Sequence, residues 1–103
     1  MNKCIRQGDV ILVPRKTAIP TDAVEQDKCV LALGEVTGHS HQIPVGAKLF
    51  TFDDKKYLQI VGEVATLQHE EHSALEIPYV EYGYDVIIQR EDDDKDEWRQ
   101  VRD

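Results

Sequence analysis

Short apolar runs separated by turn residues constrain the fold of this chain more than any other feature. The runs recur at intervals of roughly 10–15 residues, a spacing typical of antiparallel sandwiches and barrels. The strand-like segments are residues 9–14, 28–33, 47–53, 57–61, 64–69 and 82–90. Helix signals are weak, because only residues 23–28 and 94–101 favour a helical turn and neither has a wide apolar stripe. The sequence therefore predicts an all-β fold, a small antiparallel β-barrel or sandwich.

Strand alternation indicates which side chains face the core. Residues two apart on a strand point the same way, so Tyr84, Val86 and Ile88 share one face of segment 82–90. An apolar face of this length predicts a strand in the middle of a sheet rather than at its edge. We therefore expect these three side chains to be buried.

Length and composition favour one domain over residues 1–103. The chain has 103 residues, of which 41% are hydrophobic, and this is sufficient for one modest core. No apolar run approaches the ~20 residues of a membrane-spanning helix, so no membrane partner is expected. The first residues lack the apolar region of a signal peptide, and two cysteines provide no disulfide framework. These features predict a cytoplasmic protein.

The acidic charge of the chain bears on its partners. The formal net charge is −8, and an acidic C-terminal segment at 91–103 contributes much of the excess. Clustered lysines and arginines contact nucleic-acid phosphates, so no nucleic-acid partner is expected. An acidic run is usually a solvated tail. The alternative is that the acidic residues form a surface that imitates nucleic acid and binds a basic partner protein.

All four histidines lie in two close pairs, His39 with His41 and His69 with His72. Histidine is the commonest metal ligand and exchanges protons near neutral pH. His39 and His41 share a strand face, and Ile43 continues the same phase, which indicates an inward face. His69 shares a face of segment 64–69 with the apolar residues Ala65 and Leu67. We therefore expect these imidazoles to converge in one site that binds a divalent metal such as zinc, iron or nickel.

The place of His72 depends on the residues before it. On a continuous strand His72 would face away from His69, so it joins the site only if Glu70 and Glu71 form a bulge or a turn. Glu70, Glu71 and Gln42 are candidates for a further ligand or for orienting the imidazoles. Glu70 and Glu71 are also the candidate catalytic residues, as a general base for metal-bound water.

Three other interpretations stay open beside the metal site. The histidines could be exposed polar residues on loops, without a function. They could also exchange protons with a small-molecule ligand, including a phosphorylated one, in the absence of metal. In a third interpretation the protein is a non-catalytic binder that sequesters a small ligand or occupies a host protein. Whether the chain is an enzyme is therefore left open.

Residues 34–46, which contain His39 and His41, resemble the first motif of the cupins. That resemblance implies a cupin-like double-stranded β-helix with an internal metal. The match is partial, because the glutamate of the motif is absent and the first spacing is one residue short. Over nearly its whole length the chain more closely resembles small uncharacterised bacterial and phage proteins. The segments that carry this second resemblance are residues 7–10, 34–41, 69–72, 77–78 and 89–91.

The short apolar segments also suggest self-association. Segments 10–13 and 30–33 would leave sheet edges that need to be covered. Pairing of two copies is a common way to cover such edges, so the sequence predicts a homodimer.

Overall fold

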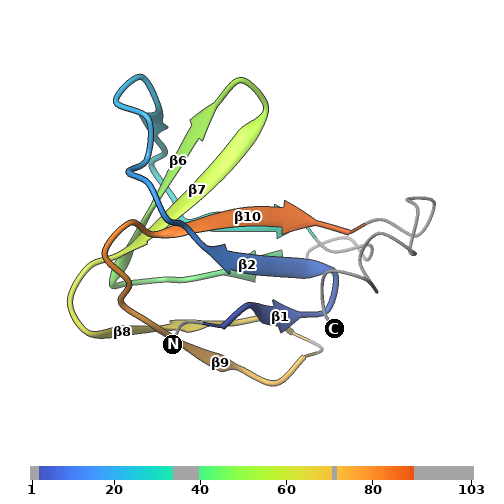
Figure 1. The fold of residues 1–103 in the computed structure, drawn as a ribbon. Helices are drawn as coiled ribbons and strands as arrows, with labels where there is room; N and C mark the ends of the chain where they lie inside the picture. The colour runs from blue at the N-terminus through green and yellow to red at the C-terminus, as the bar shows by residue number, and fades with distance from the viewer. Residues whose placement is uncertain (1–2, 34–39, 71, 90–103) are drawn as a thin grey trace.

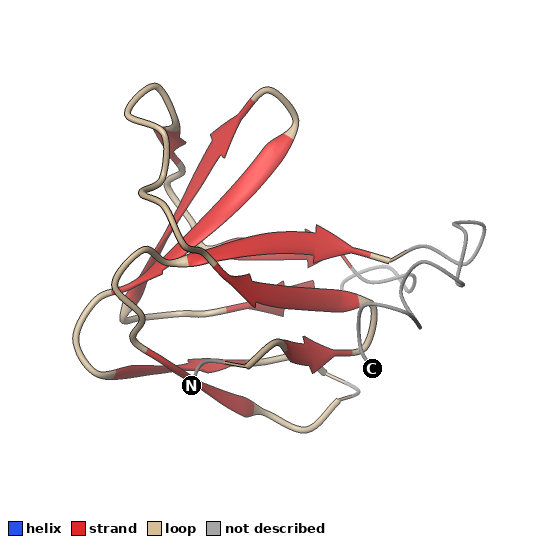
Figure 2. Cartoon of the chain, viewed as in Figure 1, coloured by secondary structure: helices blue, strands red, loops and turns tan. Residues whose placement is uncertain are grey.

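The computed structural model describes residues 3–33, 40–70 and 72–89. These residues form β-strands joined by turns and loops, with no helix among them (Figure 2). The all-β fold class predicted from the sequence is confirmed. The strands are β1 (Ile5–Gln7), β2 (Val10–Pro14), β3 (Val24–Glu25), β4 (Val30–Leu33), β5 (Ser40–Gln42), β6 (Ala47–Phe52), β7 (Lys55–Ile60), β8 (Val64–Leu67), β9 (Leu75–Pro78) and β10 (Tyr84–Ile88).

The largest sheet is antiparallel and has the strand order β1-β2-β10-β7-β6-β3. β10 lies between β2 and β7, so the last strand is central, as its apolar alternation predicted (Figure 1). Val86 pairs with Leu12 of β2 on one side and with Lys56 of β7 on the other. The Tyr84 and Val86 side chains are buried, and Ile88 packs partly buried against the core.

Two smaller ladders, β4-β5 and β8-β9, complete the structure. A bridge between Gln42 and Gln68 joins them, with backbone hydrogen bonds of 3.0 and 2.8 Å in the two directions. Together with the large sheet they enclose one apolar core, to which β2, β4, β7, β8 and β9 all contribute buried side chains. The described ladders do not close into a barrel. This arrangement places β5, the strand of His41, in contact with the chain that follows β8.

Two local expectations differ from the structure. Residues 23–28, which weakly favoured a helical turn, contain the short edge strand β3, because Val24 and Glu25 pair with Thr51 and Phe50 of β6. Strand segments 47–53 and 57–61 left residues 54–56 for the turn between them. In the structure β6 ends at Phe52, β7 begins at Lys55, and the hairpin turns at Asp53 and Asp54, with φ angles of 53° and 67°. Two positive φ angles are typical of the tight turn that matches the twist of a hairpin, and aspartate tolerates them.

The predictions for the C-terminal residues lie outside the described residues. These are the helical turn at 94–101 and the acidic segment at 91–103, and both stay predictions. Within the described part of the chain, no helix is long and apolar enough to cross a membrane.

The core assignment can be tested on β7 and the residue that follows it. Leu58 is fully buried, whereas Val61 is 51% exposed. Leu58→Ala should lower the free energy of unfolding by about 2–5 kcal/mol, because it removes buried methyl groups and leaves a cavity. Val61→Ala should change it by less than about 0.5 kcal/mol. Urea denaturation measures both, and equal costs would contradict the assigned core.

Candidate functional site

Three of the four histidines meet at one place in the structure. The ring centroids of His41 and His69 are 4.2 Å apart, those of His69 and His72 are 4.7 Å apart, and those of His41 and His72 are 5.9 Å apart. We call these three residues the histidine cluster. His39 and Glu71 lie outside the described residues, so their predicted roles stay predictions.

His41 is the buried centre of this cluster. It is the middle residue of β5 and only 1% of it is exposed, and Ile43, two residues on, is equally enclosed at 2%. The inward face predicted from the His41–Ile43 phase is therefore confirmed. A buried imidazole needs partners for both ring nitrogens, because an unsatisfied polar group inside a protein is costly.

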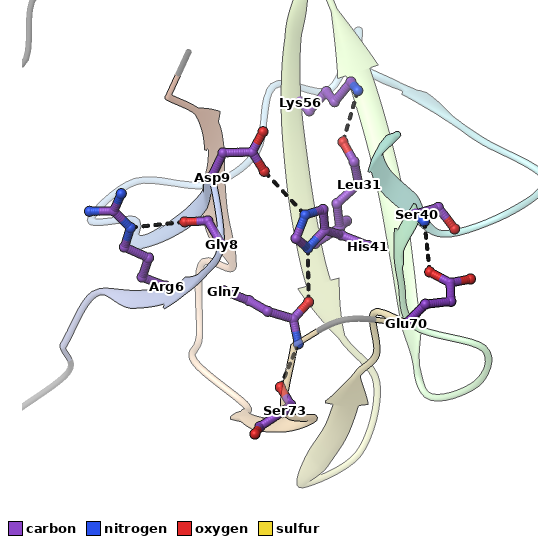
Figure 3. A network of polar contacts seen from close by, with 10 residues as sticks. All are labelled: Arg6, Gln7, Gly8, Asp9, Leu31, Ser40, His41, Lys56, Glu70 and Ser73. Carbon is purple, nitrogen blue, oxygen red and sulfur yellow. Dashed lines mark hydrogen bonds and ion pairs between the residues drawn. The ribbon is translucent and has the colours of Figure 1, made fainter. Parts of the chain in front are cut away.

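The Gln7 side chain supplies one of these partners. Its Nε2 donates to the backbone carbonyls of Leu67 and Ser73, at 3.0 and 2.9 Å. With both amide hydrogens used in this way, Gln7 Oε1 lies 2.9 Å from His41 Nδ1 and can only accept a hydrogen bond (Figure 3). His41 therefore carries a proton on Nδ1.

Asp9 faces the other nitrogen of His41. Its Oδ1 is 3.1 Å from His41 Nε2, and 36% of the Asp9 side chain is exposed (Figure 3). Burial lowers the pKa of His41 below its usual 6.5, and His69 and His72 add to this, while Asp9 opposes it. A neutral His41 has a single proton, which Gln7 holds on Nδ1. Its Nε2 then presents a lone pair to the Asp9 carboxylate, which is an unfavourable contact unless a cation is shared between them.

Gly8 allows the β1–β2 turn to approach the imidazoles closely. It has a φ of +59°, and a Cβ placed on it would lie 2.6 Å from His72 Nε2 and 3.2 Å from His41 Cε1. Arg6 Nε donates to the Gly8 carbonyl at 2.9 Å, on the side of the turn away from His41 (Figure 3). The imidazole rings of His72 and His41 therefore occupy the space in which any other residue would place its Cβ.

The chain bends after β8, and this brings His72 into the cluster. β8 ends at Leu67, Gln68 makes only the bridge to Gln42, and the chain bends at Glu70 and His72. Strand alternation no longer applies beyond Leu67, so the spacing of three residues does not turn His72 away from His69. Participation of His72 was expected to depend on Glu70 and Glu71; the bend at Glu70 agrees with this, and Glu71 lies outside the described residues.

Glu70 lies beside the cluster, on the far side from Asp9. Its Oε1 accepts a hydrogen bond from the Ser40 backbone N–H at 3.0 Å (Figure 3). A pocket of about 300 Å³ opens here. The residues that line it are Ser40, Gln42, Gln68, His69, Glu70, His72 and Ala74. Both His69 and His72 therefore belong to the cluster and to the pocket wall.

The arrangement of possible metal ligands is incomplete. Among the described residues, no group of three or more His, Cys, Asp or Glu side chains is already placed to hold a metal ion. Burial raises the pKa of the Cys29 thiol to about 11, so Cys29 does not offer a thiolate. Cys4 is exposed. The donors near one another are thus the imidazoles and Asp9.

The side of the candidate site that β1 and the turn after it provide was not predicted from the sequence. Gln7, Gly8 and Asp9 belonged to a segment of resemblance, but no role was assigned to them. An amide, a glycine and an aspartate in a tight turn are common in any β protein. Only their position against His41 connects them with the candidate site, and residues this far apart in the chain carry no local signal of that contact.

Residues 6–89 match the family described as "Domain of unknown function (DUF8820)". The match covers most of the chain, so the chain belongs to this family. Its description names no activity, and it mentions neither cupins nor phages. No curated protein and no solved structure matches the chain.

The close approach of the imidazoles to Gly8 leads to a first prediction about the site. Gly62→Ala is the control, because Gly62 also has a positive φ, of +97°, but nothing lies near its missing Cβ. A left-handed backbone costs a non-glycine residue about 1–2 kcal/mol, so both variants should lose at least this much. Gly8→Ala should lose a further amount of about 1–3 kcal/mol, because it crowds His72 and His41. Thermal unfolding compares the two, and equal losses would refute the close approach.

The lowered pKa of His41 predicts how stability depends on pH. As the pH falls, the His41 imidazole is protonated at about pH 6.5 in the unfolded chain but only at a lower pH in the folded protein. Acid therefore favours unfolding. In the presence of chelator, the free energy of unfolding should fall as pH drops below about 6.5. His41→Gln should make this fall shallower, while the carboxylates titrate alike in both proteins. Denaturation at several pH values measures the slopes, and an unchanged slope would contradict a neutral, buried His41.

Proposed function

We propose that the protein binds a divalent metal ion at the histidine cluster. His41 Nε2 and Asp9 Oδ1 would be the first pair of donors, and His69 and His72 would complete the set. The observation that carries this proposal is the 3.1 Å contact between Nε2 and Oδ1, two atoms that have no proton to share when His41 is neutral. A cation between them converts a repulsive contact into two favourable ones.

The spacing of the donors supports this proposal. Ligand atoms bound at about 2.0–2.2 Å to one ion lie roughly 3.0–3.5 Å from each other. The 3.1 Å between Nε2 and Oδ1 falls in that range. Imidazoles that share one ion have ring centroids roughly 5 Å apart by the same geometry. The centroids of the cluster are 4.2, 4.7 and 5.9 Å apart, which is close to this separation and supports His69 and His72 as the further donors.

The surroundings of His41 also suit a metal ligand. A histidine bound to metal commonly donates its second ring N–H to a carbonyl or carboxylate, which holds the ring in place. Gln7 Oε1 has this position, and its orientation is set by two backbone carbonyls. Imidazole and carboxylate donors suit zinc, iron and nickel. His39 stays a predicted fourth imidazole.

A metal held on this set would have a face toward the pocket. A water molecule bound there would have a lowered pKa, which is how such ions assist hydrolysis. Glu70 lines the pocket beside His69 and His72, so it is the described carboxylate that could accept the proton. This supports metal-assisted hydrolysis as the class of reaction for which the site is suited.

Asp9→Asn distinguishes a metal site from an ion pair. Protein purified without a histidine tag is stripped with chelator and titrated with Zn²⁺, Ni²⁺ or Co²⁺ by calorimetry. Wild type should bind one ion and gain thermal stability, because a ligand that binds only the folded state stabilises it. Asp9→Asn should bind at least about tenfold more weakly, a typical loss when part of a metal site is removed. Without metal it should be more stable than wild type, because its amide can donate to His41 Nε2.

Asp54→Asn is the matched control. It removes the same charge at the tip of the β6–β7 hairpin and should leave metal binding unchanged. If Asp9→Asn destabilises the metal-free protein, His41 is protonated and its contact with Asp9 is an ion pair. If wild type binds none of the three ions, the metal proposal is wrong. Proton exchange with a small ligand, or non-catalytic ligand binding, then takes its place.

A further inference from the structure

Two carboxamides line the pocket beside the histidine cluster and are not used by the fold. Gln42 and Gln68 pair in an antiparallel bridge through their backbone groups, so their side chains project on the same side. Both residues line the pocket of about 300 Å³. Within the described part of the chain, neither side chain makes a hydrogen bond to the protein.

Three other carboxamides in the structure have protein partners. Gln7, Gln26 and Gln59 each donate from Nε2 to carbonyl or hydroxyl oxygens, at 2.8 to 3.3 Å. The donors and acceptors of Gln42 and Gln68 are instead left for a ligand. A carboxamide has a donor beside an acceptor, so it complements an edge that also has both. The edge of a nucleobase has this pattern, and glutamine pairs with adenine through two hydrogen bonds.

Imidazole rings form another part of the pocket wall. His69 and His72 both line the pocket, and their ring centroids are 4.7 Å apart. Unpaired bases stack on aromatic side chains, and histidine is one of the residues that serve in this way. A volume of about 300 Å³ is at the small end of the range for ligand sites, which suits a single base rather than a chain of nucleotides.

The charge of the pocket favours an amine and opposes a phosphate. Glu70 is the charged side chain among the described residues that line it, and neither lysine nor arginine is among them. Glu70 Oε1 accepts the Ser40 backbone N–H at 3.0 Å, and a carboxylate has further sites that accept hydrogen bonds. A glutamate can accept from the exocyclic amine of a base. A phosphate would lack the cationic side chains that usually bind it.

From these groups we propose that the pocket binds a nucleobase with an exocyclic amine, as the uncharged base or nucleoside. The carboxamides of Gln42 and Gln68 hold the edge on which a donor and an acceptor are adjacent. Glu70 accepts a hydrogen bond from the amine, and the imidazoles at the pocket wall stack on the ring. No ion takes part in this recognition. The proposal therefore goes beyond the metal site and does not depend on it.

Adenosine and inosine test the amine directly, because inosine has nearly the same size and carries an oxygen in place of the amine. The full chain is isotope-labelled, kept in chelator and titrated with each nucleoside and with adenosine monophosphate, while NMR follows the side-chain amide signals. Adenosine should shift the signals of Gln42 and Gln68. Inosine should bind about tenfold more weakly, because it loses a hydrogen bond. The monophosphate should bind no more tightly than adenosine.

Gln68→Ala tests the assigned wall of the pocket. Gln68 is exposed, so its side chain can be removed without a cavity in the core. The variant should bind adenosine about tenfold more weakly, the loss expected for one hydrogen bond of ordinary strength. Gln26→Ala is the matched control. Its carboxamide bonds to Thr51 and does not line the pocket, so this variant should bind adenosine like wild type.

Four results would overturn the proposal. Equal affinity for adenosine and inosine would remove the role of the amine, and tighter binding of the monophosphate would remove the preference for an uncharged ligand. Unchanged affinity of Gln68→Ala would mean that the base binds elsewhere. Absence of any shift with adenosine at its limit of solubility would refute binding altogether. Because these titrations are made in chelator, none of the results bears on the metal site, which the ion titrations test separately.

Discussion

The rest of the site depends on the buried amide of Gln7. Its two hydrogens are used by the carbonyls of Leu67 and Ser73, so one side chain of β1 closes the gap to the chain around β8 and β9. Its oxygen then has one partner left, which is His41 Nδ1. Because the amide cannot reverse without losing three hydrogen bonds, it holds both the imidazole ring and the position of its proton.

The unfavourable contact follows from this arrangement. Burial lowers the pKa of His41 and so favours its neutral form, in which Nδ1 is protonated and Nε2 faces the Asp9 carboxylate without a hydrogen to share. A folded protein keeps such a contact only where the surrounding structure enforces it, and such places are often functional. The turn at Gly8 brings Asp9 to this position, and the cluster surrounds it with further imidazoles. Metal binding, as proposed, would turn the cost of this arrangement into affinity.

Much of the fold could be predicted from the sequence, because the pattern of one strand reports its own two faces. The phase of Tyr84 and Val86 identified a central strand, and the phase of His41 and Ile43 identified an inward face. These signals are local, so they persist in any β arrangement. The edge strand β3 was not predicted, because its residues are exposed and its pairing with β6 leaves no apolar pattern in the sequence.

The sequence by itself determined an all-β chain with two histidine pairs, of which His41 points inward. Only the tertiary structure decided that His72 joins His41 and His69, because this depends on where β8 ends rather than on spacing. It also decided that Gln7, Gly8 and Asp9 form the other half of the site. Alternation describes directions along one strand and carries no information about which strands meet. The packing of the whole core decides which strands meet. The candidate site lies where it brings the turn between β1 and β2 against the segments that carry the histidines.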